Sequence, residues 1–399
     1  MSIQWMRCAS LLIPAMLGMQ PLTVAAQEPL TEARAIALAL AQEGIAARDD
    51  ADRAAAKAEV DVIGPLDNPE LGVVREGGGQ TEWQLNIVQP IDLTGRRAAL
   101  RDAARAEADA TASEIERRRQ LLVADVRSAY VRCAAASAQA DIWQGYIADV
   151  TEAQRIASAR AEAGDTAVYD VRRVRVEAAA AEAGRLQAQG ERRAGCATLG
   201  GLTGMADPVV AVAAITALSH AETTAGARAD LTAQEQRVAA AEYRLSAAER
   251  ARLPQLSVGA GVRAQETGTG TQYGPIVSLG VSLPLWNGGG AAVRREDALR
   301  TSLEAELAIA RRRIAAEQSA AAARLSSSRA ATVAAIGARD DAARLGTIAN
   351  TAYQSGEIGV VELLDAYEAA RDADLSVIAF ALNAALAAVE YDLTTGRSY

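Results

Sequence analysis

The chain has 399 residues, enough for roughly two or three compact domains, but its composition does not suit a compact enzyme. Alanine is abundant and aromatic residues make up only 4% of the chain, whereas compact cores depend on large side chains. Sequence rich in Ala, Arg and Glu favours long helices that pack closely side by side. The formal net charge of −9 argues against a nucleic-acid partner, which would attract a basic surface.

Residues 1–26 have the organisation of a secretory signal peptide. Arg7 provides the positive end, residues 9–17 form a short apolar run, and Val24–Ala26 offers small residues for a cleavage site before Gln27. The apolar run is too short for a transmembrane helix, and we expect no such helix later in the chain. No cysteine lies at the cleavage site, so we expect an exported protein without an N-terminal lipid anchor.

The first unit, residues 27–204, begins with a predicted helix at about 30–59 and two predicted strands. The strands are expected at about 70–76 and 82–89, with three glycines at 77–79 between them. The second strand alternates large apolar with polar side chains, which is the pattern of a strand with two different faces. Its apolar members are Trp83, Leu85 and Ile87, and its polar members are Gln84 and Asn86.

A very long helix is predicted next, because no proline occurs between Pro90 and Pro208 and proline breaks helix interiors. We expect this helix at 96–162. At about 1.5 Å per residue it would be about 100 Å long, which is typical of a coiled coil or an extended bundle. A turn at Gly164 and a return helix at about 166–199 complete the unit.

The second unit, residues 205–399, repeats the order of the first. Ala163–Asp165 returns as Ser355–Glu357, and other short segments return at similar spacing, so the chain contains two tandem copies of one unit. We expect a helix at about 222–251, strands at about 255–264 and 275–283, a long helix at 288–354, a turn near Gly356 and a return helix at about 358–393.

Two cysteines remain in the mature chain, Cys133 and Cys196. An exported protein occupies a compartment where disulfides persist. In an antiparallel hairpin that turns at Gly164–Asp165, the numbers of facing residues have a constant sum near 329, and the two cysteine numbers have this sum. The pattern is compatible with a disulfide across the hairpin, and two small, buried, unbonded cysteines are the alternative.

The predicted strands alternate apolar residues with small or polar ones, as in barrels with a wet interior. Four strands cannot close a barrel, and an open sheet edge cannot face lipid. If the strands span a membrane, several protomers must therefore share one barrel, and three protomers would supply twelve strands. The alternative is a pair of hairpins packed on a helical core.

In its order and duplication the chain resembles the TolC-like outer-membrane efflux proteins. The resemblance extends from about Leu30 to Arg397 and rests on the two strand-to-helix junctions, 89–97 and 283–290, and on the hairpin turns. It implies a mainly α protein with a small β part, built as two tandem repeats. Long helical hairpins would form a barrel-shaped tube, and each protomer would add four strands to a trimeric, twelve-stranded transmembrane β-barrel.

The resemblance also implies a function. The protein would be a homotrimeric exit duct, embedded in outer-membrane lipid and extending into the periplasm, that serves a periplasmic adaptor protein and an inner-membrane pump. The first junction resembles the cobalt-zinc-cadmium resistance branch, where a glutamine–proline run leads into Gly-Arg-Arg, and this implies heavy-metal cation efflux. Multidrug efflux and type I protein secretion are alternatives within the family. A periplasmic coiled-coil scaffold without a pore, or an adaptor protein, are alternatives of another class.

The resemblance places the docking and gating end at the hairpin turns. Glu362 and Asp365 match the family's acidic gate positions, and Asp170 matches Glu362 in the first copy. Because Glu362 and Asp365 are three residues apart on one helix face, threefold symmetry would make them acidic rings that attract cations. The alternative is that these acids only favour the helix dipole. The expected adaptor-docking residues are Gly164, Asp165, Gly356 and Glu357.

Motifs for catalysis or cofactor binding are not convincing in this chain. Gly259–Ala264 fits a loose dinucleotide fingerprint, but a polar loop follows it where a helix is required. His220 is the only histidine, which excludes a His-rich metal site and most catalytic triads. We therefore expect a channel with no cofactor, no metal site and no enzymatic activity.

Overall fold

The computed structural model describes residues 29–78, 81–165, 167–211 and 228–397. The predicted signal peptide and His220 lie outside the described residues. The helices are α1 (Glu32–Leu40), α2 (Glu43–Val62), α3 (Arg96–Ala163), α4 (Val168–Thr203), α6 (Ala229–Arg250), α7 (Gly290–Ser355) and α8 (Val360–Thr394). The strands are β1 (Glu70–Glu76), β2 (Glu82–Ile91), β3 (Gln255–Thr267) and β4 (Gly270–Ser282). The predicted fold class, mainly α with a small β part, is confirmed.

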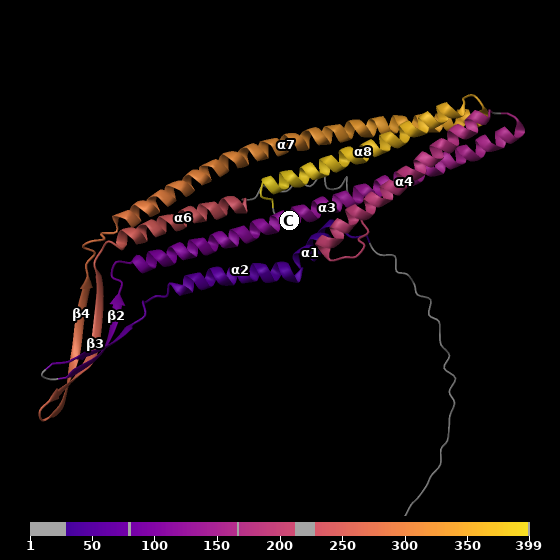
Figure 1. Ribbon diagram of the computed structural model, residues 1–399. Coiled ribbons are helices and arrows are strands. Elements are labelled where there is room, and N and C mark those ends of the chain that lie inside the picture. The colour runs from indigo at the N-terminus through magenta and orange to yellow at the C-terminus, as the bar shows by residue number, and fades with distance from the viewer. Residues whose placement is uncertain (1–28, 79–80, 166, 212–227, 398–399) are drawn as a thin grey trace, which may run out of the picture.

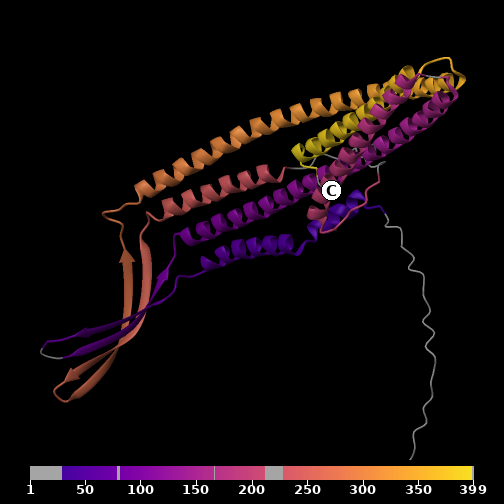
Figure 2. The ribbon, with the colours of Figure 1, turned by 45° about the vertical axis from the view of Figure 1, so that its right-hand side comes forward.

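The molecule is long, with the sheet at one end and both hairpin turns at the other (Figure 1). Near the sheet, α3 packs against α2 and α6, and α6 packs against α7. Near the turns, the hairpin α3–α4 packs against the hairpin α7–α8, chiefly through α3 and α8. A second view shows the same elongated arrangement (Figure 2).

Glycines in the same backbone conformation bound both long helices. Gly95 and Gly289 precede α3 and α7 with φ of 71°, and Gly164 and Gly356 end these helices with φ of 81° and 80°. Only glycine adopts this left-handed region at low cost, so it is the residue that can turn the chain at a helix end. The duplicated positions in the sequence are therefore duplicated in the backbone geometry.

The core is built mainly from alanine and a few larger side chains. One cluster joins α1, α3, α4 and α8 in the middle of the molecule and includes Tyr130, Leu199 and Ala385. A second cluster joins α3, α4, α7 and α8 near the turns and includes Tyr146 and Leu364. Because alanine has no side chain beyond Cβ, these helices pack closely along most of their length.

Three element boundaries differ from expectation. The helix expected at 30–59 is divided into α1 and α2, because the chain leaves the helical conformation at Gln42. Strands β3 and β4 are longer than the expected 255–264 and 275–283, and pair from Gln255–Ser282 to Thr267–Gly270. The Gly- and Thr-rich sequence between them forms a tight hairpin, in which the Thr267 hydroxyl donates to the Gly270 carbonyl at 2.6 Å.

Helix α8 is more apolar than the sequence analysis allowed. Among the described residues it is the one helix whose length and composition would permit it to cross a membrane. We expected no helix after the signal peptide to be apolar enough to cross a membrane, and the composition of α8 shows that this expectation is wrong. In the fold, α8 packs along α7 and α3 and buries residues such as Leu363, Ala381 and Val389, so packing between helices explains its apolar character.

A disulfide joins the two helices of the first hairpin. Cys133 on α3 and Cys196 on α4 are bonded, with Cα atoms 4.6 Å apart and 63 residues of separation in sequence. Both residues are buried. The second hairpin, α7–α8, contains no cysteine in its sequence.

Candidate functional site

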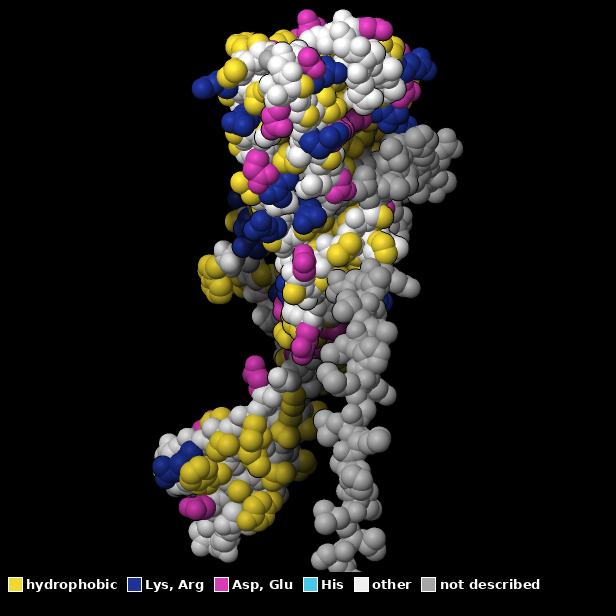
Figure 3. Space-filling model, turned by 90° about the vertical axis from the view of Figure 1, so that its right-hand side faces the viewer, with side chains coloured by type: hydrophobic (Ala, Val, Ile, Leu, Met, Phe, Trp, Pro, Cys, Tyr) yellow, Lys and Arg dark blue, Asp and Glu magenta, His cyan; other side chains and the backbone are white. Residues whose placement is uncertain are grey.

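The four strands form one antiparallel sheet in the order β1–β2–β3–β4, and its two faces differ in chemistry. The register aligns most of the large apolar side chains of the four strands on one face. Many of them are more than half exposed, and hydrophobic side chains gather over the sheet in the lower part of Figure 3. A face of this kind needs an apolar surrounding. The members of this apolar face include Leu71, Val73, Leu85, Ile87, Val262, Val277 and Leu279.

The opposite face is mostly polar or without side chains, with Val74, Val88 and Ile276 as its larger apolar members. It includes Gln84 and Asn86 on β2 and Arg263 on β3. Glycine occupies positions where neighbouring groups come close: a Cβ added to Gly261 would overlap the Leu85 carbonyl, and one added to Gly72 would overlap the Asn86 side chain. Small residues on one face allow the sheet to curve toward that face, which suits the inner wall of a barrel.

The sheet has two open edges. Within the described part of the chain, β1 pairs only with β2, and β4 pairs only with β3. Strand edges with free N–H and C=O groups accept another strand readily. In the helical part next to the sheet, α2 lies on one side, beside α3, and α7 lies on the other side, beside α6 (Figures 1 and 2). The two sides of the molecule next to the sheet are therefore formed by different elements.

Exposed apolar side chains also surround the point where strands meet helices. Trp286 is 95% exposed, Leu285 is 71% exposed and Leu93 is 73% exposed. At the other end of the sheet, Tyr273 is exposed, and the Arg75 guanidinium lies 5.4 Å from the ring centre of Trp83. Aromatic side chains at both ends of an apolar band are typical of membrane-spanning sheets.

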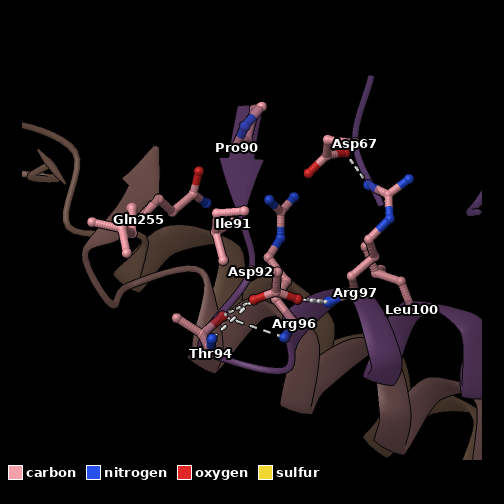
Figure 4. A pocket seen from close by; sticks show the side chains of 10 residues that line it. Asp67, Pro90, Ile91, Asp92, Thr94, Arg96, Arg97, Leu100 and Gln255 are labelled. Carbon is pink, nitrogen blue, oxygen red and sulfur yellow. Dashed lines mark hydrogen bonds and ion pairs between the residues drawn. The ribbon is translucent and has the colours of Figure 1, made fainter. Parts of the chain in front are cut away.

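The first strand-to-helix junction is held by Asp92 (Figure 4). Its carboxylate accepts the Arg97 N–H at 2.6 Å, and the Thr94 N–H at 2.9 Å and hydroxyl at 2.7 Å. Burial alone would raise the pKa of Asp92, but these hydrogen bonds outweigh it and lower the pKa. The Arg97 side chain donates to the Gly64 carbonyl at 2.7 Å and pairs with Asp67. This arginine of the Gly-Arg-Arg motif therefore ties α3 to the segment before β1.

Arg250, the last residue of α6, and Arg252, two residues after it, bind to glycines that precede the long helices. Arg250 donates to the Gly95 carbonyl at 2.7 Å, and Arg252 donates to the Gly288 carbonyl at 3.1 Å. Each junction between the sheet and a long helix is thus held by an arginine at or just after the end of α6. These contacts fix the direction in which the long helices leave the sheet.

The hairpin turns expose the expected docking residues. The Asp165 N–H donates to the Arg160 carbonyl at 2.8 Å, and the Glu357 N–H donates to the Ala352 carbonyl at 2.9 Å. These bonds close the helix ends and leave the Asp165 and Glu357 side chains exposed. Arg160 also crosses to the second hairpin, where it donates to the Tyr353 carbonyl at 2.8 Å.

The three acids expected at the gate have different surroundings. Glu362 and Asp365 are exposed on α8, whose other face buries Leu363 and Leu364. Glu362 folds back over Gly359, the residue that precedes α8, with Oε2 2.8 Å from the point where a Cβ would lie. Asp170 on α4 is half-buried, and its charge contributes to the raised pKa of Tyr353, although burial of that tyrosine is the larger cause.

A partly buried polar cluster near the turns was missed in the sequence. It contains Tyr146 on α3, Arg173 and Glu177 on α4, and Glu368 and Arg371 on α8, and we call it the hairpin joint. The Tyr146 hydroxyl donates to Glu177 Oε1 at 2.7 Å, and Arg173 Nη1 donates to Glu177 Oε2 at 3.1 Å. Arg173 Nη2 lies 3.8 Å from Glu368 Oε1. The Arg371 guanidinium lies 4.4 Å from the ring centre of Tyr146.

Only one signal could have indicated this cluster. Arg173 and Glu177 are four residues apart and therefore neighbours on one helix face. Their partners on α3 and α8 come from distant parts of the sequence. In the part of the chain that the structure describes, no group of His, Cys, Asp and Glu side chains has the arrangement of a metal site.

Comparisons with known proteins agree with this architecture. The family model described as outer membrane efflux protein matches residues 49–205 and 222–397, one match for each repeat. No curated protein matches the sequence.

Solved structures of outer-membrane channels share the fold. VceC from Vibrio cholerae is 18% identical, with a TM-score of 0.73, over 92% of this chain and 96% of that chain. CusC is 17% identical, with a TM-score of 0.75, over 91% of each chain. MtrE from Neisseria gonorrhoeae, solved in an open state, is 16% identical, with a TM-score of 0.72, over 92% of this chain and 88% of that chain.

The two family matches span most of the chain, and they confirm the expectation of a channel in place of an enzyme, located in the outer membrane and extending into the periplasm. This protein belongs to the outer membrane efflux protein family.

Proposed function

We propose that this protein is the exit duct of a tripartite efflux system, in which it receives cargo from an inner-membrane pump through a periplasmic adaptor. The observation that carries the proposal is that a sheet with one apolar and one polar face leads directly into long helices. The apolar face suits lipid, and the polar face suits a water-filled path. The helical part is long enough to reach from the outer membrane deep into the periplasm.

The duct is a homotrimer in this proposal. The side formed by β1 and α2 differs from the side formed by β4 and α7, so one copy offers each side to a different neighbour. Contacts of this head-to-tail kind generate closed rings when the rotation between copies closes. Three copies of four strands would give a closed barrel of twelve strands, which leaves no strand edge facing lipid.

The hairpin turns are the docking and gating end. Gly164, Asp165, Gly356 and Glu357 lie at the free tip of the molecule, where an adaptor could reach them. Glu362 and Asp365 lie next to this tip and are exposed. In a trimer, three copies of these acids would surround the axis and attract cations to a constriction.

The cargo in this proposal is a heavy-metal cation. The support is the resemblance of the first junction to the cobalt-zinc-cadmium resistance branch, together with the acidic tip. Multidrug efflux and type I protein secretion remain the competing cargo classes for the same duct. The exposed apolar face of the sheet argues against a soluble periplasmic scaffold.

Growth of a deletion strain tests the cargo. The strain is grown with zinc, cobalt, cadmium, nickel or copper and, in parallel, with a panel of drugs. Metal sensitivity that the wild-type gene restores to tolerance would support heavy-metal efflux. Drug sensitivity with normal metal tolerance would keep the duct and overturn the metal assignment. Wild-type growth in every condition would contradict a role in either kind of efflux.

A further inference from the structure

The four strands contain two arginines and no lysine, and the register places the two arginines on opposite faces of the sheet. Arg75 on β1 lies directly opposite Trp83 on β2, which belongs to the apolar face. Arg263 on β3 lies opposite Gln84, on the polar face. A cation on the polar face meets water, whereas a cation on a lipid-facing surface is tolerated only near the border with water. The position of Arg75 therefore needs an explanation.

Arg75 belongs to one row of side chains that crosses all four strands of the apolar face. The row consists of Arg75, Trp83, Ala264 and Tyr273, each directly opposite the next. The guanidinium of Arg75 lies 5.4 Å from the ring centre of Trp83, which is a cation–π contact. Trp83 is 46% exposed and Tyr273 is 77% exposed. The row thus combines a cation with two aromatic rings on the outside of the sheet.

This row lies at the border of the apolar face that is far from the helices. Strand β1 ends at Glu76 and β2 begins at Glu82, whereas the helices lie at the other end of the sheet (Figure 1). From Trp83 to Ile91 the strand β2 rises about 26 Å, at about 3.3 Å per residue, which is close to the apolar band of outer-membrane barrels. Because the helical part extends into the periplasm, the row faces the outer leaflet. We call this row the outer rim.

The guanidinium of Arg75 is accessible to a ligand from the membrane. Its side chain is exposed, and within the described part of the chain it makes no ion pair or hydrogen bond. Among the strand residues, Glu266 is the one acid on this face, and it lies on β3, two strands from Arg75. An arginine presents a planar fork of donors that matches phosphate. The outer rim therefore provides a site for a phosphate directly above an apolar surface.

We propose that the outer rim binds a phosphorylated glycolipid of the outer leaflet, with Arg75 holding a phosphate and the apolar face below it holding acyl chains. Lipid A has this chemistry, because its glucosamine disaccharide carries phosphates next to its acyl chains. In the trimer, each protomer contributes one such site. The inference rests on the proposed function, because it requires the apolar face of the sheet to meet lipid.

Native mass spectrometry of the detergent-solubilised mature protein, titrated with diphosphorylated lipid A, tests the site. We expect Arg75→Ala to weaken lipid A binding about fivefold, which corresponds to about 1 kcal/mol for a basic residue near an anionic membrane surface. Arg75→Lys keeps the charge and should retain most of the affinity, because an ammonium group also binds phosphate. Equal binding of lipid A by the wild type and Arg75→Ala would overturn the inference.

The matched control is Arg263→Ala, which removes the arginine of the opposite face. This variant should bind lipid A like the wild type, because the polar face does not meet lipid in the barrel. A loss of affinity equal to that of Arg75→Ala would show that the total charge of the sheet, and not the outer rim, attracts the lipid.

Two further ligands identify what the site recognises. Lipid A without its phosphates should bind the wild type as weakly as diphosphorylated lipid A binds Arg75→Ala, because the guanidinium then lacks an anion. Inorganic phosphate at millimolar concentration should not displace lipid A, because contact with the apolar face supplies part of the affinity. Undiminished binding of the dephosphorylated lipid, or displacement by inorganic phosphate, would each overturn the assignment to a phosphorylated glycolipid.

Conductance in planar bilayers separates this inference from the proposed function. Arg75→Ala and Arg263→Ala should both insert and conduct, because both side chains are exposed in the described sheet. A conducting channel whose binding of lipid A does not depend on Arg75 would overturn the lipid site alone. A protein that binds lipid A through Arg75 but conducts in no variant would support the lipid site and overturn the duct.

Discussion

At the scale of single residues, arginine side chains connect distant segments of the chain through hydrogen bonds and ion pairs. Arg97, Arg127, Arg160 and Arg250 each connect elements that are far apart in sequence. Their roles could not be predicted, because an arginine on an Ala-rich helix has the same local pattern whether it is solvated or paired. The hairpin joint was missed for this reason, whereas the acids near the turns were predicted from the resemblance of these turns to those of the efflux-protein family.

Arg127 offers the sharpest stability test among these residues. It is 1% exposed on α3, and its Nη1 donates to Asp392 of α8 at 3.0 Å. Arg127 also pairs with Glu32, and Asp392 keeps a second partner in Arg397. Loss of the central cation of this buried network costs about 3 kcal/mol, the lower end of the range for breaking a buried ion pair. We expect Arg127→Met to lower the unfolding midpoint strongly in denaturant melts of the detergent-solubilised protein.

The matched control is Arg311→Met. Arg311 pairs with Glu235 at 2.8 Å, but its side chain is 58% exposed, and pairs of this kind contribute about 0–1 kcal/mol. If the unfolding midpoint falls equally in the two variants, burial of the Arg127 pair adds nothing to the free energy of unfolding.

The gate assignment also belongs to the residue scale. Replacing Glu362 and Asp365 together by Ala should raise conductance or leakiness and weaken cation preference, because the exposed acids would no longer narrow and charge the constriction. Single-channel recording with a salt gradient measures both quantities. The double change Asp340→Ala and Asp341→Ala removes two exposed acids from α7 and should leave both unchanged. Unaltered conductance and selectivity in the gate variant would refute the assignment.

At the scale of elements, the long helices and the sheet were predictable and their interruptions were not. The gaps without proline indicated α3 and α7, and period-two alternation indicated the faces of β2, β3 and β4. The break between α1 and α2 was not predictable, because Ala41–Gln42 contains neither proline nor glycine. The length of β3 and β4 was underestimated because Gly and Thr there resemble a loop in composition, while pairing with a neighbouring strand extends them.

The disulfide gives a prediction at this scale. A bond that closes a loop of about 60 residues restricts the unfolded chain and stabilises the fold by about 2–4 kcal/mol. Cys133→Ala with Cys196→Ala should therefore fold into the same hairpin, since both sites are buried and small, but unfold at lower denaturant concentration. A reducing agent should destabilise the wild type to a similar degree and leave the double variant unaffected. Equal stability of the oxidised wild type and the variant would contradict this contribution.

Substitution of Gly261 provides a second test at the scale of elements, here of the pairing between β2 and β3. A Cβ there would overlap backbone atoms of the neighbouring strand β2, whereas a Cβ at Gly268 would meet open space. We expect Gly261→Val to reduce the amount of assembled protein in outer-membrane fractions several-fold by disturbing strand pairing. Gly268→Ala, in the turn, should assemble like the wild type, and comparable loss in both variants would argue against a packing cause.

At the scale of the whole molecule, duplication made the fold predictable from sequence alone. Two copies of one unit place two hairpin turns at one end and four strands at the other, and the family membership of the chain agrees with that arrangement. The cargo, in contrast to the fold, is not predictable from the sequence of the duct. A wide duct makes few specific contacts with what passes through it, so the sequence of the duct carries little information about the molecule transported.

The membrane-spanning role of the sheet can be tested with two adjacent residues of one strand. Leu279 lies on the apolar face and is 71% exposed, while Ser278 lies on the opposite face. An arginine on the lipid-facing side of a barrel costs about 2–4 kcal/mol near the middle of the bilayer, whereas one on the inner side meets water. Leu279→Arg should therefore reduce insertion into the outer membrane, as measured by fractionation and by recovery of a cross-linked trimer. Ser278→Arg should insert normally and lower the cation preference of the pore. If both variants insert equally well, the apolar face does not meet lipid, and the shared barrel would have to be abandoned in favour of a sheet covered by protein.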